Sequence, residues 1–150
     1  MASCFFIGHR DAPDELRPLL AETVERYITL YGVTEFIVGH YGRFDAMAAS
    51  AVRAAKKQHP EVKLMLLIPY YPPPYDTSCY DCTYYPEGME KIPKPYVIVR
   101  ANEHMIKSCS YLICYCTGLI GKTRDFLELA CQRERKGLMH ITNLAEQITT

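Results

Sequence analysis

Two short apolar segments of this sequence lead directly into glycine-bearing turns, and each turn leads directly into a helical pattern. The first segment, 3–7, precedes Gly8-His9-Arg10, and the second, 35–38, precedes Gly39-His40-Tyr41-Gly42. Short apolar runs are typical of strands, and strands that alternate with helical segments are typical of βαβ units. These two turns therefore restrict the chain to an α/β fold with a parallel sheet.

The same alternation continues along the rest of the chain. Helices are predicted over 16–31, 44–59, 97–107 and 122–135, and further strands over 63–68, 111–115 and 138–141. The strand at 63–68 is apolar almost throughout, as expected where helices cover both faces of a sheet. We therefore predict an α/β fold with a doubly wound, mainly parallel, five-stranded Rossmann-like sheet and helices on both faces.

One segment, at about 69–95, interrupts this rhythm. It holds seven of the ten prolines and six of the twelve tyrosines in the 150-residue sequence. Long loops in compact domains are usually functional or disordered, and tyrosines supply side chains that can pack. We predict a single domain over 1–150 with a Tyr/Pro-rich loop insertion at about 69–95, which acts as a lid or a subunit contact.

The charge balance and the apolar runs exclude two classes of partner. The 17 basic residues equal the 17 acidic ones, and no run of like charges stands out. An extended nucleic-acid strand usually needs a basic stripe, so we expect no nucleic-acid polymer as a partner. No apolar run approaches the ~20 residues of a membrane span, and the N-terminus has no basic leader, so we expect a cytoplasmic protein without a membrane partner.

The seven cysteines predict reduced thiols rather than a metal centre. Four of them lie in or beside apolar strand-like runs, where free cysteine behaves as a small buried hydrophobe: Cys4, Cys109, Cys114 and Cys116. Cys79-Tyr80-Asp81-Cys82 is the only CxxC, and no second ligand pair follows at a spacing that suits zinc. We expect neither a bound metal nor a cofactor.

Four loops should converge at the carboxyl edge of the sheet, where doubly wound folds bind their ligands. They begin at residues 8, 39, 69 and 116. Helix N-termini at this edge favour anions, above all phosphates. The candidate ligand-binding residues on and beside these loops are Gly8, His9, Arg10, Gly39, His40, Gly42, Asp45, Tyr70, Tyr71, Arg100, Gly121, Lys122 and Thr123.

Several of these candidates also have a purely structural interpretation. Arg10 either contacts phosphate with two guanidinium nitrogens or pairs with a neighbouring aspartate, Asp11 or Asp14. Asp45 either accepts ribose hydroxyls or caps the second helix. The two histidines are phosphate partners or plain turn residues, and Arg100 either clamps an anion or lies on the surface.

The loop at 116–123 matches a Walker A motif only in its last three residues. Cys116 stands where that motif has its first glycine, so we predict a phosphate-facing helix N-terminus at Gly121-Lys122-Thr123 rather than a P-loop NTPase. Asp125 and Glu128 follow on the same helix. Each is either a carboxylate that attacks or stabilises an anomeric carbon, or part of a solvated helix face.

The stretches Cys-Phe-Phe-Ile-Gly-His-Arg at 4–10 and Gly-His-Tyr-Gly-Arg-Phe-Asp at 39–45 resemble the SLOG superfamily. That group includes the LOG phosphoribohydrolases and DprA-like proteins, and the resemblance covers residues 4 to about 143. It implies a nucleotide-derived ligand, including ADP-ribose-type signals, with Gly8 and Arg10 on the phosphate and Gly39, Gly42 and Asp45 as a second wall. The Pro-Gly-Gly-x-Gly-Thr-x-x-Glu loop of the LOG hydrolases is not reproduced at 117–126, which has neither the paired glycines nor the glutamate.

These observations favour a binding module over an enzyme. We expect the chain to hold a small nucleotide, an ADP-ribose-type molecule or a cyclic nucleotide, as a sensor or a sequestering protein, with Tyr70 or Tyr71 stacked on the base. The alternative is a hydrolase or transferase that cleaves the N-glycosidic bond of a nucleoside monophosphate, with Asp125 or Glu128 as its carboxylate. A third possibility is an interaction protein that uses its segment 70–85. We also expect a homo-oligomer, since tyrosine is enriched at interfaces.

Overall fold

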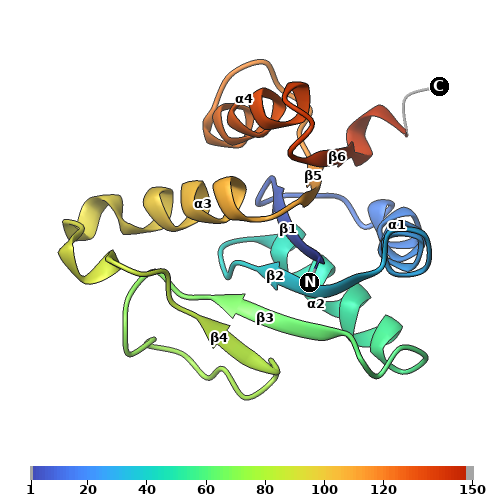
Figure 1. Ribbon diagram of the computed structural model, residues 1–150, viewed down its shortest axis with the longest axis horizontal. Helices are drawn as coiled ribbons and strands as arrows, with labels where there is room; N and C mark the ends of the chain where they lie inside the picture. The colour runs from blue at the N-terminus through green and yellow to red at the C-terminus, as the bar shows by residue number, and fades with distance from the viewer. Residues whose placement is uncertain (1, 148–150) are drawn as a thin grey trace.

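The computed structural model describes residues 2–147, in which a six-stranded parallel sheet lies between two pairs of helices (Figure 1). The strands are β1 (Ala2–Gly8), β2 (Val33–Val38), β3 (Lys63–Leu67), β4 (Cys82–Tyr84), β5 (Tyr111–Tyr115) and β6 (His140–Asn143). The helices are α1 (Leu16–Tyr31), α2 (Arg43–Lys56), α3 (Val97–Ser108) and α4 (Lys122–Arg135), with short 3-10 turns at Met89–Lys91, Lys94–Tyr96 and Leu144–Glu146. The strand order is β4-β3-β2-β1-β5-β6, and β4 and β6 form the two edges (Figure 1).

The central strand β1 shows why both faces of the sheet are covered. Cys4 and Phe6 belong to a core formed with α1 and α2, whereas Phe5 and Ile7 belong to a core formed with α3 and α4. Successive side chains of a strand point to opposite faces, so a continuous apolar run serves two cores at once. The prediction of a doubly wound Rossmann-like α/β fold is confirmed.

The predicted number of strands is wrong, because the sheet has six strands and not five. The additional strand β4 lies inside the Tyr/Pro-rich segment, where Cys82 pairs with Met65 of β3 in parallel register. Asp81 holds it there: its Oδ2 accepts a hydrogen bond from the backbone N–H of Leu64 (2.7 Å), and its carboxylate pairs with the Lys56 ammonium (2.5 Å). A three-residue strand that depends on such distant contacts leaves no periodic signal in the sequence.

The direction of the chain reverses at β1, and this reversal positions the site. From β1 the chain passes through α1 to β2, and it later returns through α3 to β5 on the other side of β1. The loops that leave the carboxyl ends of β1 and β5 therefore run to opposite faces of the sheet. In open α/β sheets, ligands bind in the crevice between such loops.

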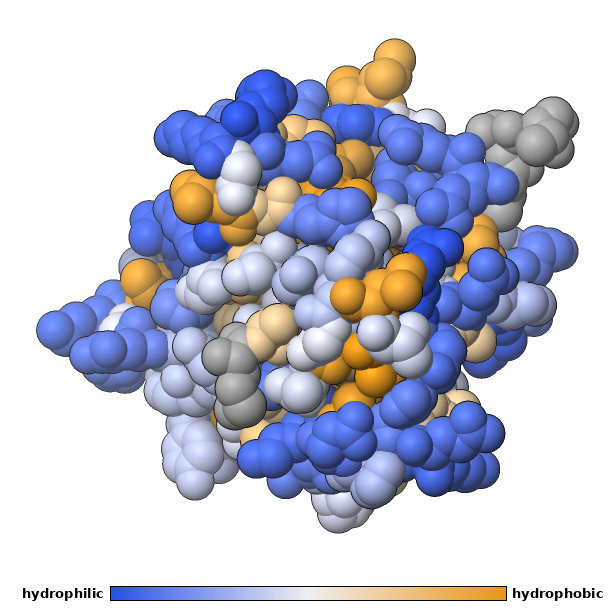
Figure 2. All heavy atoms as spheres, turned by 45° about the vertical axis from the view of Figure 1, so that its right-hand side comes forward, coloured by the Kyte–Doolittle hydropathy of each residue, from blue (hydrophilic) through white to orange (hydrophobic). Residues whose placement is uncertain are grey.

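The face of the molecule shown in Figure 2 is mainly hydrophilic. On the face shown in Figure 2, hydrophobic residues are confined to separate small patches. Among residues 2–147, none of the helices has the length and apolar character required to cross a bilayer.

Candidate functional site

A cleft of about 300 Å³ lies at the carboxyl ends of the central strands. One side of it is polar and is built by the loops after β1 and β2. The other side is mainly apolar and is built by the segment after β3 and by α3 and α4. The residues that line the apolar side are Leu67, Pro69, Ile98, Ala101 and Phe126.

Just over half of the candidate ligand-binding residues line this cleft. They come from three of the four predicted loops and are Gly8, His9, Arg10, Gly39, Gly42, Asp45 and Thr123. The remaining candidates do not line it: His40, Tyr70, Tyr71, Arg100, Gly121 and Lys122. The cleft therefore lies where the strand-to-helix turns predict it. Its opposite wall is the apolar side described above and does not contain the predicted Tyr70 and Tyr71.

Gly42 brings the first two loops into direct contact. A Cβ atom at this position would lie 2.7 Å from Cα of Arg10, which is backbone and has little room to move. The adjacent Arg43 backbone N–H donates to the carbonyl of Arg10 (N···O 3.0 Å). A side chain at position 42 would separate the two loops, so this glycine is required for close approach.

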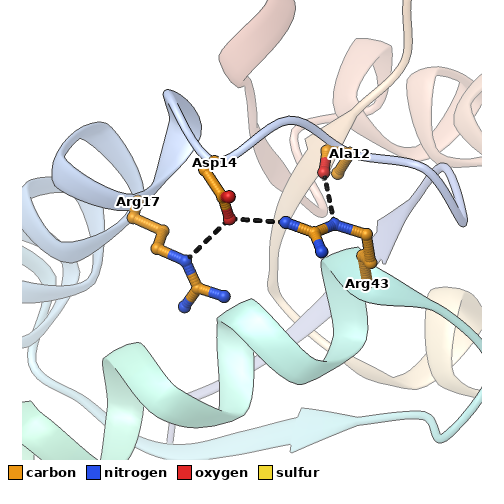
Figure 3. Close-up of polar contacts among 4 residues, drawn as sticks. All are labelled: Ala12, Asp14, Arg17 and Arg43. Carbon is orange, nitrogen blue, oxygen red and sulfur yellow. Dashed lines mark hydrogen bonds and ion pairs between the residues drawn. The ribbon is translucent and has the colours of Figure 1, made fainter.

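Arg43 and Asp14 extend this junction along the surface (Figure 3). Arg43 donates from Nε to the carbonyl of Ala12 (3.0 Å) and from a terminal nitrogen to Asp14 (2.5 Å), while Arg17 Nε contacts the same Asp14 oxygen (3.2 Å). The hydrogen bond from Arg17 and the charge of Arg43 lower the pKa of Asp14. Asp14 therefore pairs with Arg17 and Arg43 and not with Arg10.

Arg10 is the exposed cation of the cleft. Among residues 2–147, its guanidinium group has no hydrogen bond and no ion pair, although its backbone is held by Arg43. Because a guanidinium group carries five N–H donors, an unpaired one beside a cleft is free to bind an anion.

His9 ties the loop after β1 to the loop after β5. Its Nε2 accepts hydrogen bonds from the backbone N–H (3.0 Å) and the hydroxyl (3.2 Å) of Thr117, and its ring meets Tyr115 edge-on at 5.4 Å. Acceptance from a backbone N–H places the ring proton on Nδ1. His40, by contrast, stacks on Tyr75 with ring centroids 4.0 Å apart and does not reach the cleft.

Asn143, at the end of β6, is a positioning residue that the sequence analysis missed. Its side-chain amide accepts from the N–H of Cys116 and donates to the carbonyl of the same residue, both at 3.2 Å. This pair of bonds sets the start of the loop that leads to Thr123. No local signal identifies Asn143, since it lies 27 residues from its partner.

Asp45 is the carboxylate that the start of α2 contributes to the polar wall. It lies in the first turn of α2, where its Oδ2 accepts a hydrogen bond from the backbone N–H of Tyr41 (3.0 Å), and it also lines the cleft. Desolvation raises its pKa to about 6, although the Tyr41 bond acts in the opposite direction. Asp45 therefore accepts a hydrogen bond at the start of α2 and is also within reach of a ligand in the cleft.

Neither predicted stacking tyrosine lies in the cleft. The side chain of Tyr71 is 71% exposed and packs against Tyr85, and Tyr70 packs against the core beneath α3 and α4. Pro69, one residue earlier, lines the cleft instead. A flat group bound there would meet Leu67 and Ile98 and the ring of Phe126.

Asp125 and Glu128 lie outside the cleft, in a hollow of about 320 Å³ that α3 and α4 border. The turn of α4 separates them from the cleft, because Thr123 and Phe126 on the same helix face the cleft while the two acids are exposed. Within residues 2–147, the carboxylates that line the cleft are Asp11 and Asp45, and no group of three or more metal-ligating side chains is found.

No protein-family model matches this sequence, and no curated protein matches it. Three solved structures have a similar fold. DprA from Helicobacter pylori, in a structure that describes its single-stranded DNA binding mode, is 14% identical over 93% of this chain and 74% of its own, with a TM-score of 0.54. DprA from Streptococcus pneumoniae is 16% identical over 94% of this chain, with a TM-score of 0.56. The Moco carrier protein from Chlamydomonas reinhardtii is 13% identical over 99% of this chain and 94% of its own, with a TM-score of 0.57.

These similarities establish the fold. The chain has a SLOG-like Rossmann fold, as the resemblance of its first two turns implied. It spans about half the length of the Streptococcus pneumoniae DprA, 49% of that chain.

The exclusion of a nucleic-acid polymer as a partner is wrong. DprA from Helicobacter pylori has this fold and binds single-stranded DNA. The exclusion came from the net charge and from the absence of a run of like charges, and both describe the linear sequence rather than one face of the folded molecule. Binding depends instead on the charges of one face, where a few cations suffice. A balanced total therefore does not exclude this class of ligand.

Proposed function

We propose that this protein binds a nucleotide-derived small molecule in the cleft, as a sensor or a sequestering protein. The unpaired guanidinium of Arg10 is the observation that carries the proposal, because it stands where the loops after β1 and β2 meet. Its neighbouring cations Arg17 and Arg43 are occupied by Asp14.

Two helix N-termini support an anionic group at the same place. Gly42 is the N-cap of α2 and Gly121 is the N-cap of α4, and neither cap has a side-chain hydrogen bond. The helix dipole and the free N–H groups of the first turn favour phosphate at such ends, although in α2 the Arg43 N–H is already engaged by the carbonyl of Arg10. In this proposal Arg10 and the start of α2 hold the phosphate, and Thr123 contacts it from α4.

The apolar wall supports a base or another flat ring beside the phosphate. This wall is formed by Leu67 and Pro69 from β3 and the segment after it, and by Ile98, Ala101 and Phe126 from α3 and α4. A cleft of about 300 Å³ is at the lower end of the range for small-molecule sites, which favours one mononucleotide unit over a longer ligand inside it.

The test compares Arg10→Ala with Arg17→Ala in calorimetric titrations with mononucleotides, ADP-ribose and cyclic dinucleotides. Loss of a hydrogen bond to a charged group costs about 1.5–3 kcal/mol, so Arg10→Ala should weaken binding by about tenfold or more. Among residues 2–147, Arg17 pairs with Asp14 and does not line the cleft, so Arg17→Ala should bind like the wild type. Equal affinity in all three proteins would contradict the proposal.

Single-stranded DNA is the second candidate ligand, since DprA from Helicobacter pylori shares the fold and binds it. A labelled oligothymidylate added to the same three proteins separates the two cases. Displacement of the oligonucleotide by a mononucleotide would identify the cleft as the shared site. Oligonucleotide binding that Arg10→Ala leaves unchanged would place the DNA on another face.

The alternative of an N-glycosidic hydrolase or transferase has less support. Such chemistry needs a carboxylate within about 3 Å of the reacting centre, and Asp125 and Glu128 line a different hollow. The bound nucleotide should therefore be recovered intact after hours of incubation. Release of free base that is lost in Asp125→Ala or Glu128→Ala would reverse this conclusion.

A further inference from the structure

A carboxylate lies within the cleft that we assign to an anion. Asp45 stands in the first turn of α2, the same helix end that would hold the phosphate. Its Oδ2 accepts the N–H of Tyr41 (3.0 Å) and packs so closely on the turn that a Cβ at Gly39 would lie 2.9 Å from it. The carboxylate is thus held in position beside the bound anion.

No cation in the described part of the chain neutralises this carboxylate. Asp45 forms no ion pair among residues 2–147, and its hydrogen bond there is with the Tyr41 backbone N–H. The titratable or charged groups that line the cleft around it are His9, Arg10 and Asp11 from the first loop and Tyr41 from its own loop. The lining residues from α3 and α4, which include Asn102 and Thr123, carry no charge.

An ionised Asp45 would oppose a phosphate at this helix end, since two like charges in a partly desolvated cleft repel strongly. Removal of the charge relieves this repulsion and also creates a donor. Burial, opposed by the hydrogen bond from Tyr41, already raises the pKa of Asp45 to about 6, so little further change is needed near neutral pH.

We propose that Asp45 takes up one proton from solvent when the cleft binds its anionic ligand. The neutral carboxyl then donates a hydrogen bond to a ligand oxygen while Oδ2 continues to accept from Tyr41. This inference rests on the proposed function, because it requires an anion in the cleft. It differs from the ribose-hydroxyl role predicted for Asp45, in which the carboxylate stays ionised and accepts.

The coupling has a definite sign. Because the bound form holds a proton that the free form loses as pH rises, affinity falls by up to tenfold per pH unit above the free-state pKa of Asp45. Asp45→Asn keeps the shape and an oxygen that accepts from Tyr41, but it cannot exchange a proton. Its affinity should lack this decline and exceed that of the wild type at alkaline pH.

The experiment is calorimetric titration with ADP-ribose and, separately, with inorganic sulfate, neither of which has an anionic group that ionises near neutral pH. Each titration is run from about pH 5.5 to about pH 8 in two buffers of different ionisation heat, which counts the protons exchanged. The number of protons that the wild type takes up per bound ligand should approach one near neutral pH. Asp45→Asn should take up none. Carbon NMR of the Asp45 carboxyl should show its pKa rising on saturation, while exposed Asp76 serves as an internal reference.

The outcomes separate this inference from the proposed function. Binding with no proton uptake, or with an unchanged pKa of Asp45, would overturn the inference and leave the binding function intact. If wild-type binding does not depend on pH and Asp45→Asn abolishes it, Asp45 acts as an ionised acceptor of ribose hydroxyls instead. Absence of binding at every pH would overturn the proposed function and this inference with it. Proton uptake that persists undiminished in Asp45→Asn would also overturn the inference.

Discussion

Two arginines that follow glycines in adjoining loops have opposite environments. Arg43 is engaged by Ala12 and Asp14, and it fastens the loop after β1 to the start of α2. Arg10 follows Gly8 by two residues, and its guanidinium group has no polar partner in the described part of the chain. The contrast arises because the same junction that orders the Arg10 backbone leaves its side chain at the edge of the cleft.

Asp45 should cost the ligand-free protein stability at neutral pH. Its pKa is about 6 in the folded state and 3.8 in a model peptide, so the folded state binds more protons than the unfolded state between these values. Stability from this group is therefore greatest at low pH and is lost as pH rises through about 6. Asp45→Asn should raise the free energy of unfolding by about 2–3 kcal/mol at about pH 8 and change it little at about pH 4.

Urea unfolding at both pH values measures this difference. Asp76→Asn is the matched control, because hydrogen bonds from Ser78 lower the pKa of Asp76 and so reverse the sign of its effect. An Asp45→Asn gain of equal size at both pH values would show that titration is not its cause.

At the scale of elements, β4 shows how a segment without a periodic pattern joins a sheet. The excursion after β3 is fastened to α2 at its far end: Arg53 donates to the carbonyl of Cys79, its guanidinium lies 5.0 Å from the Tyr80 ring, and Lys56 pairs with Asp81. Asp81 also accepts from Leu64, so one carboxylate joins the excursion to a helix and to a strand. Three residues of edge strand would gain little from pairing alone.

Asp81→Ala should therefore release the excursion while the rest of the sheet stays folded. Removal of the carboxylate leaves the Leu64 N–H without its side-chain partner and Lys56 without its counter-ion. We expect at least severalfold faster cleavage within 70–81 in limited proteolysis, with little change in circular dichroism.

Asp76→Ala is the control for this experiment, because Asp76 bonds only within its own turn, to Ser78. Cleavage at the same rate in the wild type and both variants would show that Asp81 does not anchor β4.

At the scale of the whole molecule, the two cores on either side of the sheet determine which thiols are accessible. Cys4 lies in the core beneath α1 and α2, whereas Cys109, Cys114 and Cys116 lie in the core beneath α3 and α4. Burial raises the pKa of Cys109 to about 11 and raises the pKa of Cys4 and Cys114 well above the usual value. These three thiols are protonated and shielded, and both properties slow their reaction.

Native thiol labelling should therefore show two fast sites, the exposed Cys79 and Cys82. Cys131, which is half-buried, should react more slowly, and the four buried thiols should react only on unfolding. A Cys79→Ser, Cys82→Ser double variant should lose the fast phase entirely. Mass spectrometry of the labelled peptides assigns each phase, and a fast phase at Cys4 or Cys114 would contradict the placement of the two cores.

Local patterns predicted the repeated strand-to-helix turns and their convergence at one edge of the sheet, because strand runs and glycine turns depend on residues close together in the chain. Gly8, Arg10, Gly42 and Asp45 were accessible to that reasoning for the same reason. The residues of the apolar wall could not be predicted in this way. Ile98 and Phe126 lie on helices whose patterns indicate burial without showing which neighbours they meet.

The α/β class and the polar wall of the cleft could be predicted from the sequence, since both follow from backbone preferences over a few residues. The folded molecule was needed to show that β4 pairs with β3, that Asn143 holds the loop at Cys116, and that Asp125 and Glu128 lie outside the cleft. Each of these depends on a contact between distant segments or on the rotation of a packed helix. Such contacts form because they bury surface and satisfy polar groups across the whole molecule, so no local window of sequence contains them.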